Sequence, residues 1–415
     1  MDLTNTFSTR TKVIAALICA LFITSTLQAN SATISGTKCT KVNSTKTAGN
    51  TKYTCVKSGK KLVWNKGVAL KPAPSASPSP TPSASKSSEP APTPSVSTSA
   101  TPIPTATPTF TPPAASTSFD NLIENYKGIA YAAWSKSRAK IQSSNAKANN
   151  FNLYIGANTV IPNKNPQAAY DLVARLYDGF VQPKRTDVLA FGWTDRDWAE
   201  NQMKTLMPTS EWRWLKTTAC ATKETCWGGG AFTDNEGNFL LVITTEVVDD
   251  NHTSGTLEAH EFTHGIQQAQ FGKPQPWPPL NTWPPTWIVE GQAEFSQNAA
   301  IFNESYDEYI KNRYAVSQNL FKNPAYDSAF FSKYFILNPP QSWYDTNDRW
   351  LQYDAGGMLV EILVALNGPD SIMNLWLQMG KGSTFHEAFK NIYGTDFDKA
   401  LPIIAKAIAL EVGKS

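Results

Sequence analysis

The stretch Ser254–Gly272, SGTLEAHEFTHGIQQAQFG, has the pattern of one helix. Ser254 or Thr256 can cap its start, and Gly272 stands where a C-terminal stop is expected. Four apolar residues recur at helical spacing and predict a stripe that faces the core. They are Ala259, Phe262, Ile266 and Ala269.

The other side of this helix carries two histidines four residues apart. His260 and His264 project from neighbouring turns toward a common point, and Glu261 lies about 100° round from His260. H-E-x-x-H on a helix is typical of a zinc site, in which two neutral imidazoles bind Zn²⁺ and the glutamate polarises a water. The competing interpretation is a helix with two solvated histidines.

A catalytic zinc site needs a third protein ligand, and the segment WIVEGQAEF, residues 287–295, offers two. Glu290 and Glu294 stand one helical turn apart, so spacing alone leaves the choice between them open. With Glu290 as the ligand, Glu294 can accept the outer N–H of a ligating imidazole and fix its tautomer, and the alternative is a carboxylate on the helix surface.

These two motifs together resemble the gluzincins, the zinc peptidases that include thermolysin-like and aminopeptidase N-like enzymes. The family pattern is H-E-x-x-H followed by W-x-x-E-G-x-A, which Trp287, Glu290, Gly291 and Ala293 match. The resemblance implies that His260, His264 and Glu290 bind Zn²⁺, that Glu261 is the general base and that Glu294 supports an imidazole. The Pro- and Trp-rich segment 273–285 is similar to an insertion between the motifs.

Three further features are interpreted beside this resemblance. Tyr353 opens a segment, YDAG, similar to the Tyr-x-x-Gly of aminopeptidase N-like enzymes, which implies stabilisation of an oxyanion; packing is the alternative. The strand at 238–245 takes the place of the family's substrate-binding edge strand. Gly228–Gly230 is interpreted as a flexible turn, and His252 and His386 as surface residues.

The N-terminus has the pattern of an export signal. Residues 1–29 contain Arg10 and Lys12, an apolar run and a small-residue cleavage site, although an uncleaved anchor has the same features. Its removal leaves four cysteines, an even count that suggests disulfides in an exported chain. Sequence separation favours the pairs Cys39–Cys55 and Cys220–Cys226.

Charge divides the rest of the chain into unlike parts. Residues 31–71 contain nine Lys and no acid, and they predict a small β module stapled by Cys39–Cys55. Residues 72–118 are almost wholly Pro, Ser, Thr and Ala, which predicts a disordered linker. From residue 119 onward, 25 Lys and Arg stand against 32 Asp and Glu. A basic module on an acidic globule in an exported chain favours an anionic envelope polymer or membrane surface as partner, and disfavours nucleic acid.

The fold class expected for residues 119–415 is α+β, with a mixed α/β lobe before the zinc helix and a helical lobe after it. Strands are expected at 152–160, 186–192 and 238–245. Helices are expected at 119–146, 165–180, 195–206, 286–302, 304–321, 350–366, 369–379, 383–392 and 396–412.

The function expected is that of an exported, bacterial zinc metallopeptidase, secreted or bound to the envelope, which hydrolyses peptide bonds in a peptide or protein substrate. The first alternative is an inactive peptidase-fold protein that binds the cell envelope. The second is a structural zinc domain, which the open fourth coordination position disfavours.

Overall fold

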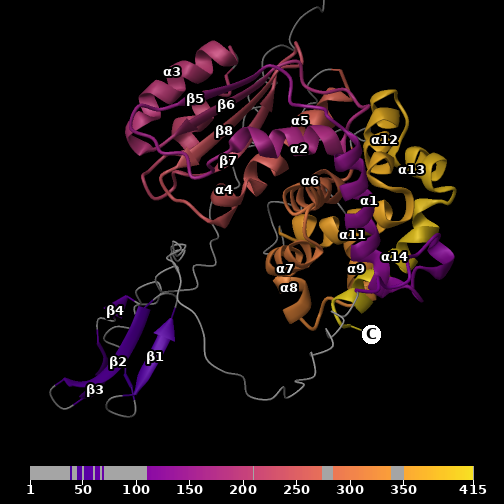
Figure 1. Cartoon of the computed structure of the whole chain (residues 1–415), viewed down its shortest axis with the longest axis horizontal. Helices are drawn as coiled ribbons and strands as arrows, with labels where there is room; N and C mark the ends of the chain where they lie inside the picture. Colours follow the sequence, from indigo (N-terminus) through magenta and orange to yellow (C-terminus); the bar gives the residue numbers. More distant parts are fainter. Residues whose placement is uncertain are drawn as a thin grey trace, which may run out of the picture. The chain divides into compact units, whose positions relative to one another are not determined.

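The computed structural model describes residues 38–39, 44–48, 51–58, 61–65, 68–69, 110–208, 210–272, 284–337 and 350–414. The expected signal peptide, the linker up to residue 109 and segment 273–283 lie outside these residues. The chain divides into two compact units, with the boundary between Phe110 and Thr111 (Figure 1).

The smaller unit is an antiparallel sheet, as its alternating sequence predicts. Strands β1 (Thr45–Ala48), β2 (Thr51–Ser58) and β3 (Lys61–Trp64) pair in that order, and β4 (Val68–Ala69) also pairs with β2. The predicted disulfide between Cys39 and Cys55 is present, with the two Cα atoms 5.9 Å apart. Both cysteines are buried, so the disulfide takes the place that an apolar core has in a larger domain.

The larger unit begins earlier than the sequence indicates. Residues 111–118, assigned above to the linker, belong to this unit. Ser116 is buried, and the carbonyl of Ala114 lies so close to Gly128 that a Cβ there would be 2.0 Å from its oxygen. Ser118 then forms a capping box with Asn121. The expected helix at 119–146 starts only at Ile129, after two short 3-10 turns.

A four-stranded sheet forms the first half of this unit (Figure 1). The strands run in the order β5 (Phe151–Ile155), β6 (Thr186–Phe191), β8 (Phe239–Thr245) and β7 (Trp227–Thr233). β5, β6 and β8 are parallel, whereas β7 pairs antiparallel with β8. Parallel strands covered on both faces have nearly continuous apolar sequences, and β6 and β8 do.

The two faces of the sheet pack against different helices. Phe239 and Leu241 share one core with α2 (Pro166–Leu176) and with α5 (Thr256–Ala269), the helix that carries H-E-x-x-H. Leu240 and Val242 share a second core with α3 (Arg196–Leu206) on the other face. Alternate residues of β8 therefore hold the two layers of helices together.

Two expectations about this sheet are wrong. β8 is an interior strand, bonded to β6 on one side and β7 on the other, and not the edge. The edges are β5 and β7, and β7 contains Gly228–Gly230, the segment interpreted as a turn. Glycine lowers strand propensity, but Gly230 faces the ring of Trp214, where a Cβ would be 2.7 Å from the nearest ring carbon.

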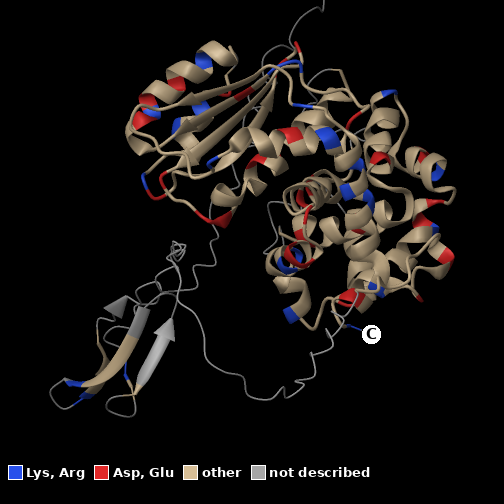
Figure 2. Cartoon of the chain, viewed as in Figure 1, with Lys and Arg blue, Asp and Glu red and all other residues tan. Residues whose placement is uncertain are grey.

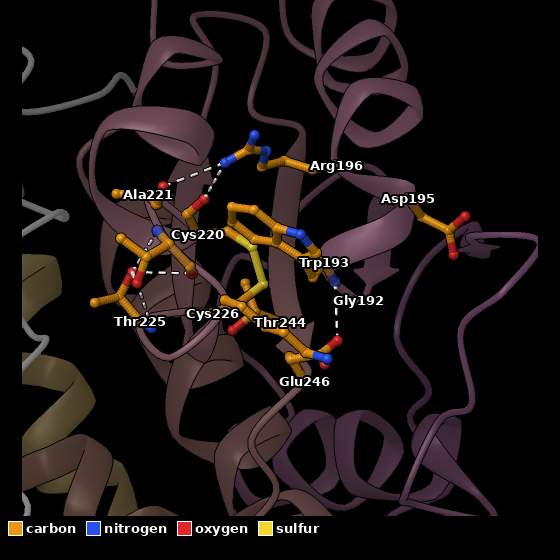
Figure 3. Close-up of a disulfide and its surroundings, with 12 residues drawn as sticks. Gly192, Trp193, Asp195, Arg196, Cys220, Ala221, Thr225, Cys226, Thr244 and Glu246 are labelled. Atoms are coloured by element: carbon orange, nitrogen blue, oxygen red, sulfur yellow. Dashed lines mark hydrogen bonds and ion pairs between the residues drawn. A yellow bond between two sulfur atoms is a disulfide. The ribbon is translucent and has the colours of Figure 1, made fainter.

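The second predicted disulfide, Cys220–Cys226, closes a short loop just before β7. Arg196 donates hydrogen bonds to the carbonyls of Cys220 and Ala221, and its guanidinium lies 4.0 Å from the centre of the Trp193 ring (Figure 3). The disulfide and this cation–π contact together fix the start of the edge strand.

The second half is helical, as expected. Its helices are α6 (Thr286–Ile301), α7 (Tyr306–Val316), α8 (Gln318–Lys322), α9 (Ser328–Leu337), α11 (Leu351–Asn367), α12 (Pro369–Gly380), α13 (Phe385–Tyr393) and α14 (Phe397–Glu411). They pack against α1 (Ile129–Ser143) in the largest core of the chain. The helix predicted over 304–321 is two helices, α7 and α8, and α9 was not predicted. Among the described residues, no helix is both long and apolar enough to cross a membrane.

Candidate metal centre

The zinc-motif helix, α5 (Thr256–Ala269), starts at a sharp break in the chain. Gly255 has φ +91° and separates α5, the one helix expected in this stretch, from the short helix α4 (Asp250–Ser254), which was not predicted. The left-handed region favours glycine, which makes this break specific to Gly255. Gly272 has φ +69°, in agreement with the predicted stop.

One face of α5 is seated on β8. Phe262 contacts Phe239 of β8 and Tyr170 of α2, with ring centres 5.5 and 5.2 Å apart. Gly265, which follows the motif, allows this approach, since a Cβ there would be 2.6 Å from the Phe239 ring. Seating α5 in this way directs the two histidines toward α6.

Helix α6 is in turn fixed by a close backbone contact with α11. A Cβ on Gly291 would be 2.2 Å from the carbonyl carbon of Gly356, and one on Gly356 would be 2.2 Å from the Trp287 oxygen. Only glycine fits at either position. This contact sets the height of Glu290, the residue before Gly291, relative to α5.

The three predicted ligands meet. One ligand atom from each of His260, His264 and Glu290 lies within 4.8 Å of the others. The Nε2 atoms of His260 and His264 are 3.4 and 3.3 Å from the same carboxylate oxygen of Glu290. Three side chains from two helices thus form a group that can hold a metal ion, and Glu290, not Glu294, is the carboxylate in it.

The charges in this group are strongly coupled. Burial alone would raise the pKa of Glu290, but the imidazoles of His264 and His260 outweigh it and lower that pKa to about 2. Burial would lower the pKa of His264, yet the Glu290 carboxylate raises it to about 9. The buried carboxylate and the imidazoles therefore stabilise each other's charged forms.

A chain of amide hydrogen bonds defines which nitrogen of His264 carries a hydrogen. Trp376 can only donate, and its indole N–H binds the side-chain oxygen of Gln292. The Gln267 amide nitrogen donates to that oxygen, at 3.1 Å, and to the carbonyl of Val289, at 3.0 Å. The remaining Gln267 oxygen must accept, and His264 Nδ1 lies 2.9 Å from it.

This series of hydrogen bonds bears on whether a metal ion fits between His264 and Glu290. Because Nδ1 of His264 donates to Gln267, the neutral ring presents a lone pair on Nε2 to the Glu290 oxygen. Two acceptors that face each other at 3.3 Å need a cation between them. A proton or a metal ion fills that role, and two imidazoles with one carboxylate are a donor set that binds metals well.

The surroundings of His260 are different. Glu294 Oε2 is 3.8 Å from His260 Nδ1, which is ion-pair range and longer than a hydrogen bond, and its other oxygen accepts from Gln297 at 2.8 Å. The ring of Tyr353, at the start of α11, stacks on His260 with centres 5.7 Å apart. The structure thus brings both predicted accessory residues to the group.

Glu261 is beside the group and not within it. Burial raises the pKa of its carboxyl, and the two neighbouring histidines partly oppose this effect. A carboxylate of raised pKa accepts a proton more readily than an ordinary glutamate.

The two remaining histidines do not behave alike. His386 is exposed, as expected. His252 is buried, contrary to expectation, because it forms the capping box of α4: its Nδ1 lies 2.7 Å from Asp249. The D-x-x-H spacing was the available signal for this cap.

Gln267, Gln292 and Trp376 were not anticipated, because glutamine carries no motif and the partners are up to 109 residues apart. Comparisons with protein-family models, with curated proteins and with solved structures found no match to this chain.

Proposed function

We propose that this chain is an exported zinc metallopeptidase, with a zincin-like arrangement of the larger unit. The observation that carries the proposal is that ligand atoms of His260, His264 and Glu290 lie within 4.8 Å of one another. Glu261, which is not one of these ligands, is the neighbour of His260 in the sequence. Three protein ligands, two nitrogens and one oxygen, are typical of catalytic zinc, whereas structural zinc sites have four.

Zinc bound by these residues would polarise a carbonyl and lower the pKa of a water molecule. The protein's own part is proton transfer: Glu261 takes the proton of the attacking water and delivers it to the leaving amine. Tyr353 donates its hydroxyl hydrogen to the oxyanion that forms on the carbonyl, a contribution of a few kcal/mol in comparable sites.

The substrate we propose is an extended peptide. β7 is the edge strand of the sheet next to β8, and Gly229 lies against the start of α5, with Leu257 3.5 Å from where its Cβ would be. A peptide that pairs with this edge would lie alongside the motif helix, held by main-chain hydrogen bonds.

The decisive experiment separates an enzyme from an inactive protein with the same fold. Glu261→Gln keeps the ligands and should therefore keep one zinc per chain, while cleavage of a peptide library falls by about 10²–10⁴. Glu236→Gln, the same change at an exposed turn, is the matched control. Wild-type protein that binds zinc but cleaves nothing would favour the inactive envelope-binding alternative, and a fully active Glu261→Gln would contradict the role given to Glu261.

A further inference from the structure

The small basic unit carries its lysines on both sides of a thin sheet. In the β2–β3 register, Lys57 is opposite Leu62 and lies on the same side of the sheet as Cys55 and Trp64. Lys61 is opposite Ser58 and lies on the other side, with Val56. Lys38 is bridged to Val63, which shares the side of Lys61. All three lysines are exposed. Figure 2 colours the described lysines of this unit blue.

Neither side of this sheet is covered by an apolar layer within the described part of the unit. Cys39 and Cys55 are its buried residues there, and Val56, Leu62 and Val63 are half-buried. Phe110, at the end of this unit and outside the sheet, is exposed, but no large apolar side chain is exposed among the sheet residues whose burial the structure describes. The described surface of the sheet therefore offers charge on two sides and nothing that would insert into a bilayer.

The sequence adds that no acid neutralises these lysines, since residues 31–71 contain nine Lys and neither Asp nor Glu. A planar anionic surface would contact one side of such a sheet and leave the other side's lysines in water. A flexible anionic chain can follow both sides and release counterions at each contact.

We infer that this unit is a binding site for a flexible polyanion, a linear polymer with closely spaced phosphate or carboxylate groups. Binding rests on charge and on the disulfide-held sheet, and it is independent of the proposed peptidase activity. It would retain the larger unit on such a polymer through residues 72–110.

The test uses the full chain and two matched single variants. Lys57→Gln and Lys61→Gln each remove one charge from adjacent positions of the same hairpin, on opposite sides of the sheet. Binding to linear polyphosphate, and to poly-L-glutamate of equal charge, is measured by fluorescence anisotropy in low and physiological salt. The two probes distinguish phosphate from carboxylate recognition. Vesicles that contain phosphatidylglycerol provide the planar surface.

Both single variants should weaken polymer binding by about fivefold at low salt, and their effects should shrink as salt increases. The triple variant K38Q/K57Q/K61Q should lose most of the affinity. The control K147Q/K333Q/K381Q, which removes three exposed lysines of the larger unit, should change little.

Two results would overturn the inference. If only one of Lys57 and Lys61 matters and vesicles bind as tightly as the polymers, the partner is a planar surface. If the control triple variant weakens binding as much as the module triple variant, the attraction is not located in this unit. Intact Cys39–Cys55 pairing, checked by mass spectrometry, confirms that each variant retains its fold.

Discussion

β8 and α6 are both central, buried elements, yet they are buried for different reasons. Every residue of β8 but the last is buried, and nearly all of these are apolar. Almost all of α6 is buried as well, but its buried residues include Glu290, Gln292, Glu294, Ser296, Gln297 and Asn298. Burial of polar groups costs free energy unless they are paired. Burial of α6 therefore depends on partners for its polar side chains, whereas burial of β8 depends on apolar packing alone.

The largest effect is expected where α6 meets α11. Gly291→Ala places a methyl group 2.2 Å from the Gly356 carbonyl carbon, so the helices must separate. We expect a loss of about 4 kcal/mol in the free energy of unfolding and loss of zinc binding. Urea unfolding and zinc titration measure the two effects.

Gly357→Ala is the control, because its Cβ would meet the flexible Glu294 side chain at 3.3 Å and a backbone atom, the Gly291 oxygen, only at 3.8 Å. If the two variants are equally stable, the backbone contact does not set the position of α6.

An intermediate effect is expected from the amide chain. Gln267→Ala removes the acceptor of His264 Nδ1 and frees the ring to adopt either tautomer. Residues that support a ligand in this way typically contribute 10- to 100-fold to metal affinity, and we expect a loss in this range. Competition with a chromophoric chelator measures it.

Gln268→Ala, the neighbouring position on α5, controls for changes in helix propensity. Unchanged zinc affinity in Gln267→Ala would show that His264 needs no such support, and it would weaken the contrast between α6 and β8.

The smallest effect is expected from the apolar elements. Ile243→Val in β8 deletes one buried methylene and should cost about 1 kcal/mol in stability, with unchanged zinc affinity. Ile288→Val makes the same deletion in α6, where the side chain is also fully buried. A similar cost at both positions would show that the two elements differ only in their polar residues.

The local parts of the site were predictable, and its packing was not. The 3.6-residue period places His260 and His264 of H-E-x-x-H on one side of a helix. Glu290 was chosen over Glu294 only because W-x-x-E-G-x-A resembles the family pattern. The apolar run of β8 predicted a strand. Its interior place in the sheet was not predicted, because the glycines of β7 do not have the pattern of a strand. The support of His264 by Gln267, Gln292 and Trp376 arises only when distant helices pack, so no local pattern encodes it.

The close contact between Ala114 and Gly128 has a consequence for proteolysis. Cleavage of the chain before Thr111 would release the larger unit with the contacts of Ala114, Ser116 and Ser118 intact, and so would leave its fold undisturbed. Cleavage a few residues later would strip Ser116 and Ser118 from their places and expose the start of α1. The point of scission therefore decides whether the larger unit is released intact or damaged.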